Sequence, residues 1–385
     1  MTGEPQENTP RKSRRIQRWW LIVSVVVVFS AVSLAGYAAS RGSGPEDLPE
    51  GWQIIRPPRE VSALAEWAGL IWAGGSDGLL ALDPATGEPV PEAVASLEGA
   101  ASLRYVSSLL VDREGRLWVG HEAGLTVCEG ATGAPPRTYT EADGLPHPWV
   151  RCLLEESGGR VWAGTFHGAA AIHEGRVTVL DSAGGLLVDE VNVVFQDSSG
   201  GLWFGSAAAP RGGLSLLVGG EWRYMTVDDG LPHNNINALI EDNNGAVWVA
   251  TGFYDRGGVA RLLGAGGEGG GEAREGGGGW VVAGTWDRST GMPGAKGRSL
   301  FQARDGSLWL GTEYDGVLRL DAPPASGGYP TELQGRVFND TNGLAHNEVK
   351  AMLQDTEGNL WLATHDGVTR IAREALARLA GNGDN

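Results

Sequence analysis

The chain repeats one arrangement of apolar and polar positions seven times between residues 51 and 372. Each copy starts with a short apolar run, such as VNVVF or INALI, and passes through acidic and polar residues to a glycine. Three residues after that glycine comes a tryptophan. The tryptophans are Trp72, Trp118, Trp162, Trp203, Trp248, Trp309 and Trp361. Short apolar runs bounded by glycine and polar turns are typical of β-strands, and the spacing of about 46 residues is typical of a propeller blade.

Two further strands complete each predicted unit. Runs such as GLTVC and GVLRL predict a third strand, and runs such as GEWRYMTV and GRVTVL predict a fourth. The pattern therefore predicts an all-β fold, a seven-bladed β-propeller of four-stranded antiparallel blades. The seventh copy ends at Ile371 without an outer strand, whereas GWQIIRP at residues 51–57 resembles an outer strand without a blade. We expect this N-terminal strand to close the ring, which removes the exposed edges of an open array.

Glycine and alanine recur at two positions around each tryptophan. The glycine three residues before it is expected to have a positive φ in the hairpin between the first and second strands. Two residues after the tryptophan comes Gly or Ala, on the same face of the strand. A large ring beside a missing side chain indicates the contact of one blade with the next. We therefore expect the tryptophans to be core residues, because each would bury about 150 to 250 Å².

The segment before the repeats has a different pattern. Residues 1–18 form a basic tail that includes Arg11, Lys12, Arg14, Arg15 and Arg18, and residues 19–40 carry no charge. A stretch of this length can cross a bilayer as one helix, and the preceding basic residues place the N-terminus in the cytoplasm. We expect a signal-anchor helix at 19–40, a linker at 41–50 and a propeller outside the cytoplasm. Cleavage as a signal peptide, which would release a secreted protein, is the alternative.

Composition narrows the class of partner. The formal net charge is −17, which disfavours nucleic acid as a ligand. The two cysteines, Cys128 and Cys152, are expected to be packed residues and not a bridged pair. The glycine-rich insertion at residues 264–279 is expected to be a mobile loop between a third and a fourth strand, and residues 373–385 a C-terminal tail.

Five copies also carry a turn eighteen residues before the tryptophan, for example DGLPHPWV and DGLPHNNI. Together with the run D-x-x-G-x-L-W-x-G-T-x-x-G-L, this turn resembles the two-component regulator propeller repeat over nearly all of residues 51–372. The first copy departs from the pattern, because its turn is missing. The family occurs in exported sensor regions of hybrid histidine kinases and in separate propeller proteins. The resemblance implies a propeller that senses or binds a ligand, often a carbohydrate, and this sequence contains no kinase region.

Candidate site residues come from two sets of loops that should emerge on one face of the propeller. The loops that lead into first strands carry three aligned histidines, and the hairpins between second and third strands carry polar and aromatic residues that vary between copies. The histidines are His147, His233 and His346. The hairpin residues are His121, Glu122, Phe166, His167, Arg211, Tyr254, Asp255, Arg256, Tyr314, Asp315, His365 and Asp366. The alternatives are a role within the repeat turn for the histidines and solvated loops for the other residues.

No catalytic set, metal site or cofactor is predicted. The three histidines belong to blades three, five and seven, which is too far apart for ligands at about 2 Å from one ion. The first hypothesis is a membrane-anchored sensor-type propeller that presents a carbohydrate or peptide ligand, or a partner surface, to a membrane signalling protein. A lyase or hydrolase is the second, since propellers of similar repeat catalyse eliminations, and a pure protein-interaction scaffold is the third.

Overall fold

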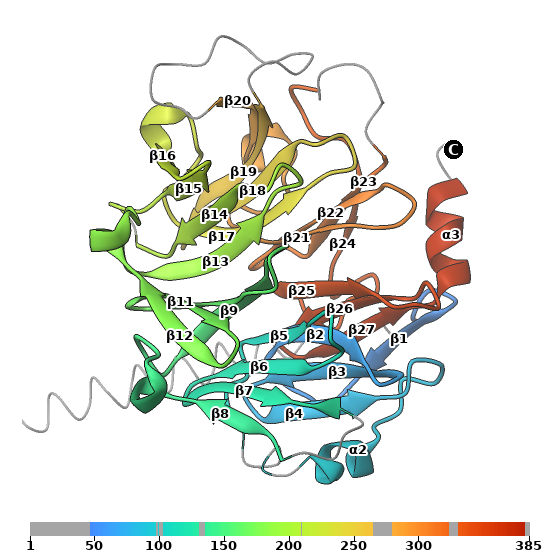
Figure 1. The fold of residues 1–385 in the computed structure, drawn as a ribbon. Helices are drawn as coiled ribbons and strands as arrows, with labels where there is room; N and C mark the ends of the chain where they lie inside the picture. The colour runs from blue at the N-terminus through green and yellow to red at the C-terminus, as the bar shows by residue number, and fades with distance from the viewer. Residues whose placement is uncertain are drawn as a thin grey trace, which may run out of the picture. The chain divides into compact units, whose positions relative to one another are not determined.

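The computed structural model describes residues 47–97, 99, 103–130, 135–208, 210–264, 279–322 and 330–381. These residues fall into seven antiparallel sheets, in which each strand pairs with its neighbour in the sequence except at the closure of the ring (Figure 1). The predicted anchor at 19–40 and the core of the glycine-rich insertion lie outside the described residues. Among those described, no helix is long and apolar enough to span a membrane.

The sheets are the seven predicted blades. Blades one to three consist of β2 (Val61–Trp67), β3 (Leu70–Gly75) and β4 (Gly78–Leu82); β5 (Ser108–Val111), β6 (Leu117–His121), β7 (Gly124–Cys128) and β8 (Arg137–Tyr139); and β9 (Val150–Glu155), β10 (Val161–Thr165), β11 (Gly168–His173) and β12 (Arg176–Leu180). Blades four and five consist of β13 (Val191–Gln196), β14 (Leu202–Ser206), β15 (Leu214–Val218) and β16 (Glu221–Met225); and β17 (Ile236–Glu241), β18 (Val247–Phe253), β19 (Arg256–Gly264) and β20 (Trp280–Trp286). Blades six and seven consist of β21 (Gly297–Gln302), β22 (Leu308–Thr312), β23 (Val317–Leu320) and β24 (Arg336–Phe338); and β25 (Val349–Gln354), β26 (Leu360–Thr364), β27 (Gly367–Ile371) and β1 (Trp52–Ile55).

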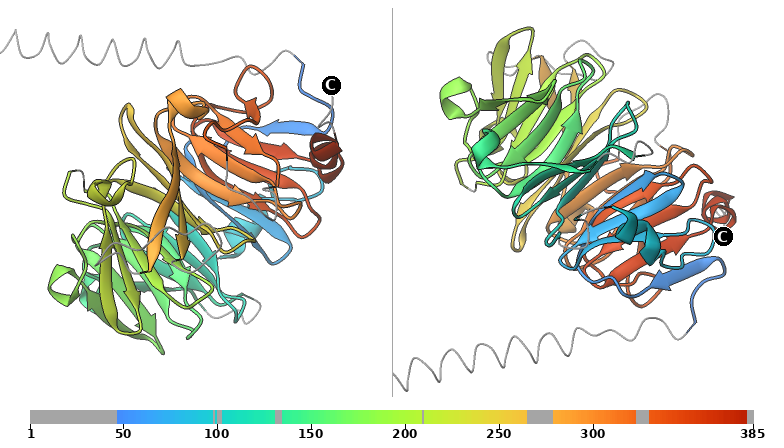
Figure 2. Two further views of the ribbon diagram at one scale, coloured as in Figure 1. Left: turned by 90° about the horizontal axis from the view of Figure 1, so that it is seen from above. Right: turned by 60° about the horizontal axis from the view of Figure 1, so that its bottom comes forward.

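The ring is closed by the N-terminal strand, as predicted. Strand β1 pairs antiparallel with β27, with Trp52 opposite Ile371, so the two ends of the propeller share one sheet (Figure 2). The first strand of each blade contacts the first strand of the next, and β25 of blade seven contacts β2 of blade one. The seven first strands therefore surround a common axis.

The first blade differs from the prediction of four strands. In the part of the chain that the structure describes, this blade has three strands, followed by an isolated bridge between Leu82 and Pro89 and a short helix, α2 (Pro91–Ser96). Proline has no backbone N–H to donate to a sheet, and Pro84, Pro89 and Pro91 lie where the fourth strand would form. The other six blades have four strands each.

The repeat tryptophans form the contacts between blades. All seven are nearly or fully buried, and each lies in a cluster with residues of the following blade. Trp361 of blade seven, for example, packs with Val61 and Ile71 of blade one. The small residue two positions later allows this approach, because a Cβ on Gly164 would lie 2.4 Å from the Sγ of Cys152 and 2.8 Å from Val191 of the next blade. The prediction of core tryptophans is confirmed.

An acidic residue holds the indole in most blades. Six positions before the tryptophan, a carboxylate oxygen accepts the indole N–H of Trp118, Trp162, Trp203, Trp248 and Trp361 at 2.7 to 2.8 Å. In blade six Ala303 occupies the acidic position, and Ser307 accepts from Trp309 instead. In all seven copies the glycine of this turn has a positive φ, between 76° and 96°, as predicted.

The C-terminal segment forms a helix where the sequence suggested only a tail. Helix α3 (Arg373–Gly381) follows β27 directly, and its Ala375 and Leu376 are buried against Trp52 of the closing strand. The helix thus covers the sheet that joins the two ends of the propeller. Cys128 and Cys152 are free thiols, as expected. Burial raises the pKa of both thiols to about 11, so they are inert packed groups at neutral pH.

Candidate functional site

Three residues at the entry to each first strand form what we call the entry triplet; its middle residue begins the strand in six blades, and in blade two the triplet directly precedes β5. The triplets are residues 60–62, 105–107, 149–151, 190–192, 235–237, 296–298 and 348–350. The middle residue is always buried, and it is Val, Ile or, in blade six, Gly. The two flanking residues change from blade to blade and include acids, bases, amides, hydroxyls and aromatic rings. The propeller therefore keeps one position of the triplet for packing and varies the other two.

A β-bulge releases the third residue of the triplet from the sheet. In six blades the pairing with the second strand skips this residue, so that Val150 and Cys152 oppose Thr165 and Gly164 while Arg151 has no partner in the ladder. Bulges of this kind redirect one side chain and are common next to functional sites. The bulged residues are Ser62, Arg151, Asn192, Asn237, Arg298 and Lys350.

Side chains of the bulged positions reach the entry triplet of the next blade. The Arg151 guanidinium donates to Asn192 Oδ1 at 2.6 Å, and the Asn192 amide donates to the Ile236 carbonyl at 2.6 Å. The Asn237 amide in turn donates to the Gly297 carbonyl at 2.8 Å. Because these bonds run from blade to blade around the common axis, the triplets of blades three to six form a polar belt at one end of the first strands. We call this end the entry face.

The part of the entry face formed by blades two and three is aromatic. Trp149 is 39 % exposed and Tyr105 is 49 % exposed, and their ring centroids lie 6.3 Å apart. Trp149 also meets Phe166 edge-on at 6.2 Å, and His147 meets Phe166 at 5.3 Å. The guanidinium of Arg151 lies 4.5 Å above the Phe166 ring. Exposed aromatic side chains that adjoin a cation can bind a ligand that has both an apolar face and polar groups.

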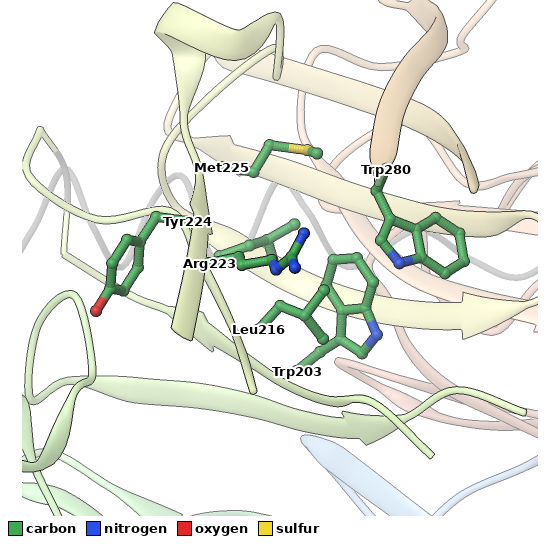
Figure 3. A pocket seen from close by; sticks show the side chains of 7 residues that line it. Trp203, Leu216, Arg223, Tyr224, Met225 and Trp280 are labelled. Carbon is green, nitrogen blue, oxygen red and sulfur yellow. The ribbon is translucent and has the colours of Figure 1, made fainter. Parts of the chain in front are cut away.

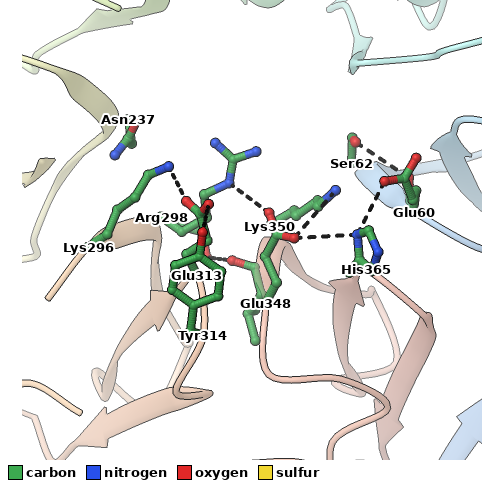
Figure 4. Close-up of polar contacts among 12 residues, drawn as sticks. Glu60, Ser62, Asn237, Lys296, Arg298, Glu313, Tyr314, Glu348, Lys350 and His365 are labelled. Carbon is green, nitrogen blue, oxygen red and sulfur yellow. Dashed lines mark hydrogen bonds and ion pairs between the residues drawn. The ribbon is translucent and has the colours of Figure 1, made fainter. Parts of the chain in front are cut away.

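The part formed by blades six, seven and one is charged (Figure 4). Lys296 forms an ion pair with Glu313, and Arg298 lies 3.5 Å from a carboxylate oxygen of Glu348. Glu348 also lies 3.8 Å from Lys350 and 3.5 Å from the Nδ1 of His365. His365 continues the network to Glu60 of blade one at 3.2 Å. Acids and bases alternate along this network, so its charges compensate one another.

The pKa values in this network reflect its hydrogen bonds. Burial by itself would raise the pKa of Glu313, but the hydrogen bonds from Lys296 and Tyr314 and the charge of Lys296 lower it. The same bond to Glu313 is the main cause that raises the pKa of Tyr314 to about 12. Glu313 is therefore ionised and Tyr314 is a hydrogen-bond donor at neutral pH.

The three aligned histidines have a role in their turns. Nδ1 of His147, His233 and His346 accepts the backbone N–H of the residue two positions later, at 2.9 to 3.0 Å. This Nδ1 bond leaves Nε2 of each ring free of the turn. Burial lowers the pKa of His233, with smaller effects from Arg256 and Lys296. Burial also lowers the pKa of His346, whose ring lies 5.1 Å from that of His365. Both rings are therefore neutral at pH 7.

The hairpin residues differ in their surroundings. His121 is 4 % exposed, its Nε2 lies 3.0 Å from the Thr126 hydroxyl, and its Nδ1 accepts the Ala123 N–H, so its ring faces protein. Asp315 pairs with Arg288, and Asp366 pairs with Arg56 and Arg59. The remaining predicted residues are exposed or half-buried on their hairpins: Glu122, Phe166, His167, Arg211, Tyr254, Asp255, Arg256, Tyr314 and His365.

Sequence reasoning missed the entry triplets, including Tyr105, Trp149 and Arg151. A signal was present, because the first triplet residue lies thirteen positions before the repeat tryptophan in six copies and twelve before it in the first. An alignment extended by these few residues displays E-V-S, Y-V-S, W-V-R, E-V-N, N-I-N, K-G-R and E-V-K in one column block. The bulge that redirects the third residue is a feature of strand pairing, which the periodicity does not reveal.

A shallow hollow lies between blades four and five (Figure 3). Its walls are Trp203, Leu214, Leu216, Arg223, Tyr224, Met225 and Trp280. Trp203 is a repeat tryptophan whose ring meets Trp280 edge-on at 5.2 Å. The hollow is thus the outer end of a blade contact. Among the residues described, no group of three or more His, Cys, Asp or Glu is placed to hold a metal ion.

Comparison with known proteins agrees with this architecture. The family model described as "Two component regulator propeller" matches residues 102–123, 230–253 and 343–366. These are the repeats around Trp118, Trp248 and Trp361. No curated protein sequence matches the chain.

Solved structures share the fold at low sequence identity. The extracellular domain of an inferred hybrid two-component system from B. thetaiotaomicron is 18 % identical, with a TM-score of 0.63. The match covers 84 % of this chain and 42 % of that domain, so this chain spans about two fifths of its length. Virginiamycin B lyase from Staphylococcus aureus is 14 % identical, with a TM-score of 0.54, and the match covers 83 % of this chain and 97 % of the lyase. At these identities the likeness concerns the propeller fold.

Proposed function

We propose that this chain, a seven-bladed propeller of two-component regulator propeller repeats, is a sensor-type module that binds a small polar ligand, a sugar or a short peptide, at its entry face. Residues 19–40 tether it to a membrane, so that the propeller lies outside the cytoplasm and presents the ligand to a membrane signalling protein. The proposal extends the likeness to the extracellular sensor domain.

The observation that carries the proposal is the variation of the entry triplets. Positions with a structural role recur in the blades, as the buried tryptophan and the middle triplet residue do. The flanking triplet positions occupy equivalent places but carry Trp149 in one blade, Lys296 in another and Glu348 in a third. Such variation would let each blade contribute a different group to a single ligand, as the few convergent polar groups of a binding site do.

The aromatic part of the entry face, formed by blades two and three, supports a sugar as the first choice of ligand. Trp149 is the one tryptophan among the exposed large apolar side chains of the described residues, and it lies beside Tyr105 and Phe166. The face of an indole ring packs well against the C–H groups of a pyranose, while neighbouring amides and charges bind its hydroxyls. The excess of acidic over basic residues, 47 against 30, disfavours nucleic acid.

The proposal is tested with the full chain in detergent or nanodiscs on arrays of glycans and peptides, followed by titration of each hit. We expect the Trp149→Ala variant to lose at least about tenfold in affinity, which corresponds to about 1.4 kcal/mol. Tyr224→Ala is the matched control, because Tyr224 is similarly exposed but lies on the outer strand of blade four. If no array compound binds, or if both variants bind like the wild type, the proposed site is wrong.

The tether is tested separately. The full chain should remain in the membrane fraction after alkaline carbonate extraction, and a variant without residues 19–40 should be released. A full-length protein found wholly in the supernatant would contradict the tether and leave the ligand proposal to its own test.

A further inference from the structure

We propose that the ligand carries a carboxylate, which Arg151 binds, while Trp149 and Tyr105 hold the attached sugar ring. The ligand class is then an oligosaccharide that contains a uronic acid. This inference rests on the proposed function and defines the chemistry of the ligand at the same face.

Three of the bulged positions carry a basic residue. Arg298 and Lys350 both lie near the same carboxylate, that of Glu348, at 3.5 and 3.8 Å. Arg151 occupies the equivalent position in blade three, yet its guanidinium contacts the neutral Asn192 and the ring of Phe166. Of the three basic residues at bulged positions, Arg151 is the one without a carboxylate at ion-pair distance among the described residues.

The composition of blades two and three explains this difference. The first triplet residue is an acid in blades one, four and seven, but it is Tyr105 in blade two and Trp149 in blade three. Within its own triplet, Arg151 therefore has Trp149 at the position where Lys350 has Glu348. Glu190 of blade four is close enough to act on the charge of Arg151 but does not form an ion pair with it.

Arg151 is also held in one orientation. Its Nη2 donates to Asn192 at 2.6 Å, and Asn192 is itself anchored to the Ile236 carbonyl. Phe166 supports the guanidinium plane from one side at 4.5 Å. Burial is the main cause that lowers the pKa of Arg151. A guanidinium has five N–H donors, so this one keeps donors for a carboxylate, and the bond would be charge-assisted.

A sugar fits the surroundings better than an acidic peptide does. The ring centroids of Tyr105 and Trp149 are 6.3 Å apart, their planes are tilted by 46°, and both rings are exposed. Trp149 lies in the same triplet as Arg151, so an apolar surface adjoins one fixed cation, and a uronic acid has the matching arrangement of a ring and an attached carboxylate. A peptide would present its carboxylate on a flexible side chain or at its end, without a ring for the aromatic pair.

The test uses oligosaccharides of galacturonate and of glucuronate, each beside its methyl ester, in which the carboxylate is neutral. Binding to the full chain is followed by calorimetry and by tryptophan fluorescence. We expect the acids to bind at least about tenfold more tightly than the esters, and Arg151→Gln to remove this preference. Trp149→Ala should weaken acid and ester alike. Arg176→Gln is the matched control, because Arg176 is an exposed arginine on the outer strand of the same blade.

The outcomes separate this inference from the proposed function. If the esters bind as tightly as the acids, or if Arg151→Gln keeps the preference, the carboxylate inference is wrong although the sugar site stands. Preferential binding of an acidic peptide such as tetraglutamate, lost in Arg151→Gln, also overturns it, because the carboxylate then belongs to a peptide. If none of these probes binds while another glycan does, the inference fails and the proposed function is kept. Melting curves of the variants serve to check that each one is folded.

Discussion

The repeat tryptophans and the entry triplets lie on neighbouring strands of the same blades, and they differ in what the repeats preserve. The tryptophan recurs in all seven copies, is buried, and packs against the next blade. The first and third residues of the triplet recur in position, but their chemistry changes from blade to blade. They lie at the entry face. The comparison teaches that repetition marks positions where every blade faces the same neighbour, whereas variation marks positions where the seven blades face one shared space.

The sharpest way to break this comparison is to truncate a repeat tryptophan. Trp361 is fully buried, and its indole N–H donates to Asp355 at 2.8 Å at the contact that closes the ring. Trp361→Ala should lower the free energy of unfolding by about 3 to 5 kcal/mol, because it leaves a large cavity. The measurement is chemical denaturation followed by circular dichroism. Trp149→Ala in the same assay should cost less than about 1 kcal/mol, and equal losses would refute the division into core and face.

A smaller loss is expected where a blade approaches its neighbour too closely for a side chain. Gly164→Ala should destabilise the protein by about 1 to 3 kcal/mol, because the new Cβ would overlap Cys152 and Val191. Adding Cys152→Ala removes the sulfur and should restore part of the loss. A double variant no more stable than Gly164→Ala alone would show that the sulfur contact is not the cause.

The acid that holds the indole predicts a dependence on pH. Burial by itself raises the pKa of Asp112, but hydrogen bonds from Trp118 and Arg116 and the charge of Arg116 lower it below 3.8. A carboxyl whose folded-state pKa is lowered stabilises the protein above its unfolded pKa, and this stabilisation is lost as the pH falls through the folded value. Asp112→Asn should therefore cost about 1 to 3 kcal/mol at pH 7 and less below pH 4. Melting temperatures of both proteins from pH 3 to 7 test this, and parallel curves would contradict it.

The smallest expected effect concerns the charged part of the entry face, formed by blades six, seven and one. Tyr314 is 60 % exposed, and its bond to Glu313 is the main cause of its raised pKa, which is about 12. Glu313→Gln should bring this pKa back towards 10, because it removes the charged acceptor that raises it. The phenolate absorbance of each protein is compared with that of a Tyr314→Phe derivative, so that one tyrosine is followed. A pKa that stays near 12 would assign the shift to another neighbour.

Much of the fold could be predicted because each blade repeats the same local sequence pattern. The tryptophan, the glycine before it and the small residue after it predicted the hairpins and the blade contacts that the structure has. The first blade departed from the prediction because its prolines replace a fourth strand by a bridge and a helix. The C-terminal helix was missed because only its contact with the closing strand, through Ala375 and Leu376, identifies its buried face.

The candidate site was predicted less completely, for a physical reason. The three histidines stand out because they recur, and their Nδ1 atoms bind their own turns. Arg151, Trp149 and Tyr105 do not recur, so no periodicity identifies them. His121 is the opposite case, because this polar hairpin residue was predicted to face a ligand and its side chain is buried. A residue's place in a hairpin does not determine which way its side chain faces.

The sequence alone determined that seven equivalent strand sets exist and that the first strand of the chain completes the last set, because local hydrophobic spacing and hairpin chemistry act over a few residues. The tertiary structure decided which side chains meet at the entry face. Ring closure brings residues from seven distant segments to one axis, and the bulge at each entry triplet turns a side chain towards its neighbour. These are contacts between segments that are remote in the chain, and so the uncompensated Arg151 beside two exposed rings could be recognised only in the folded molecule.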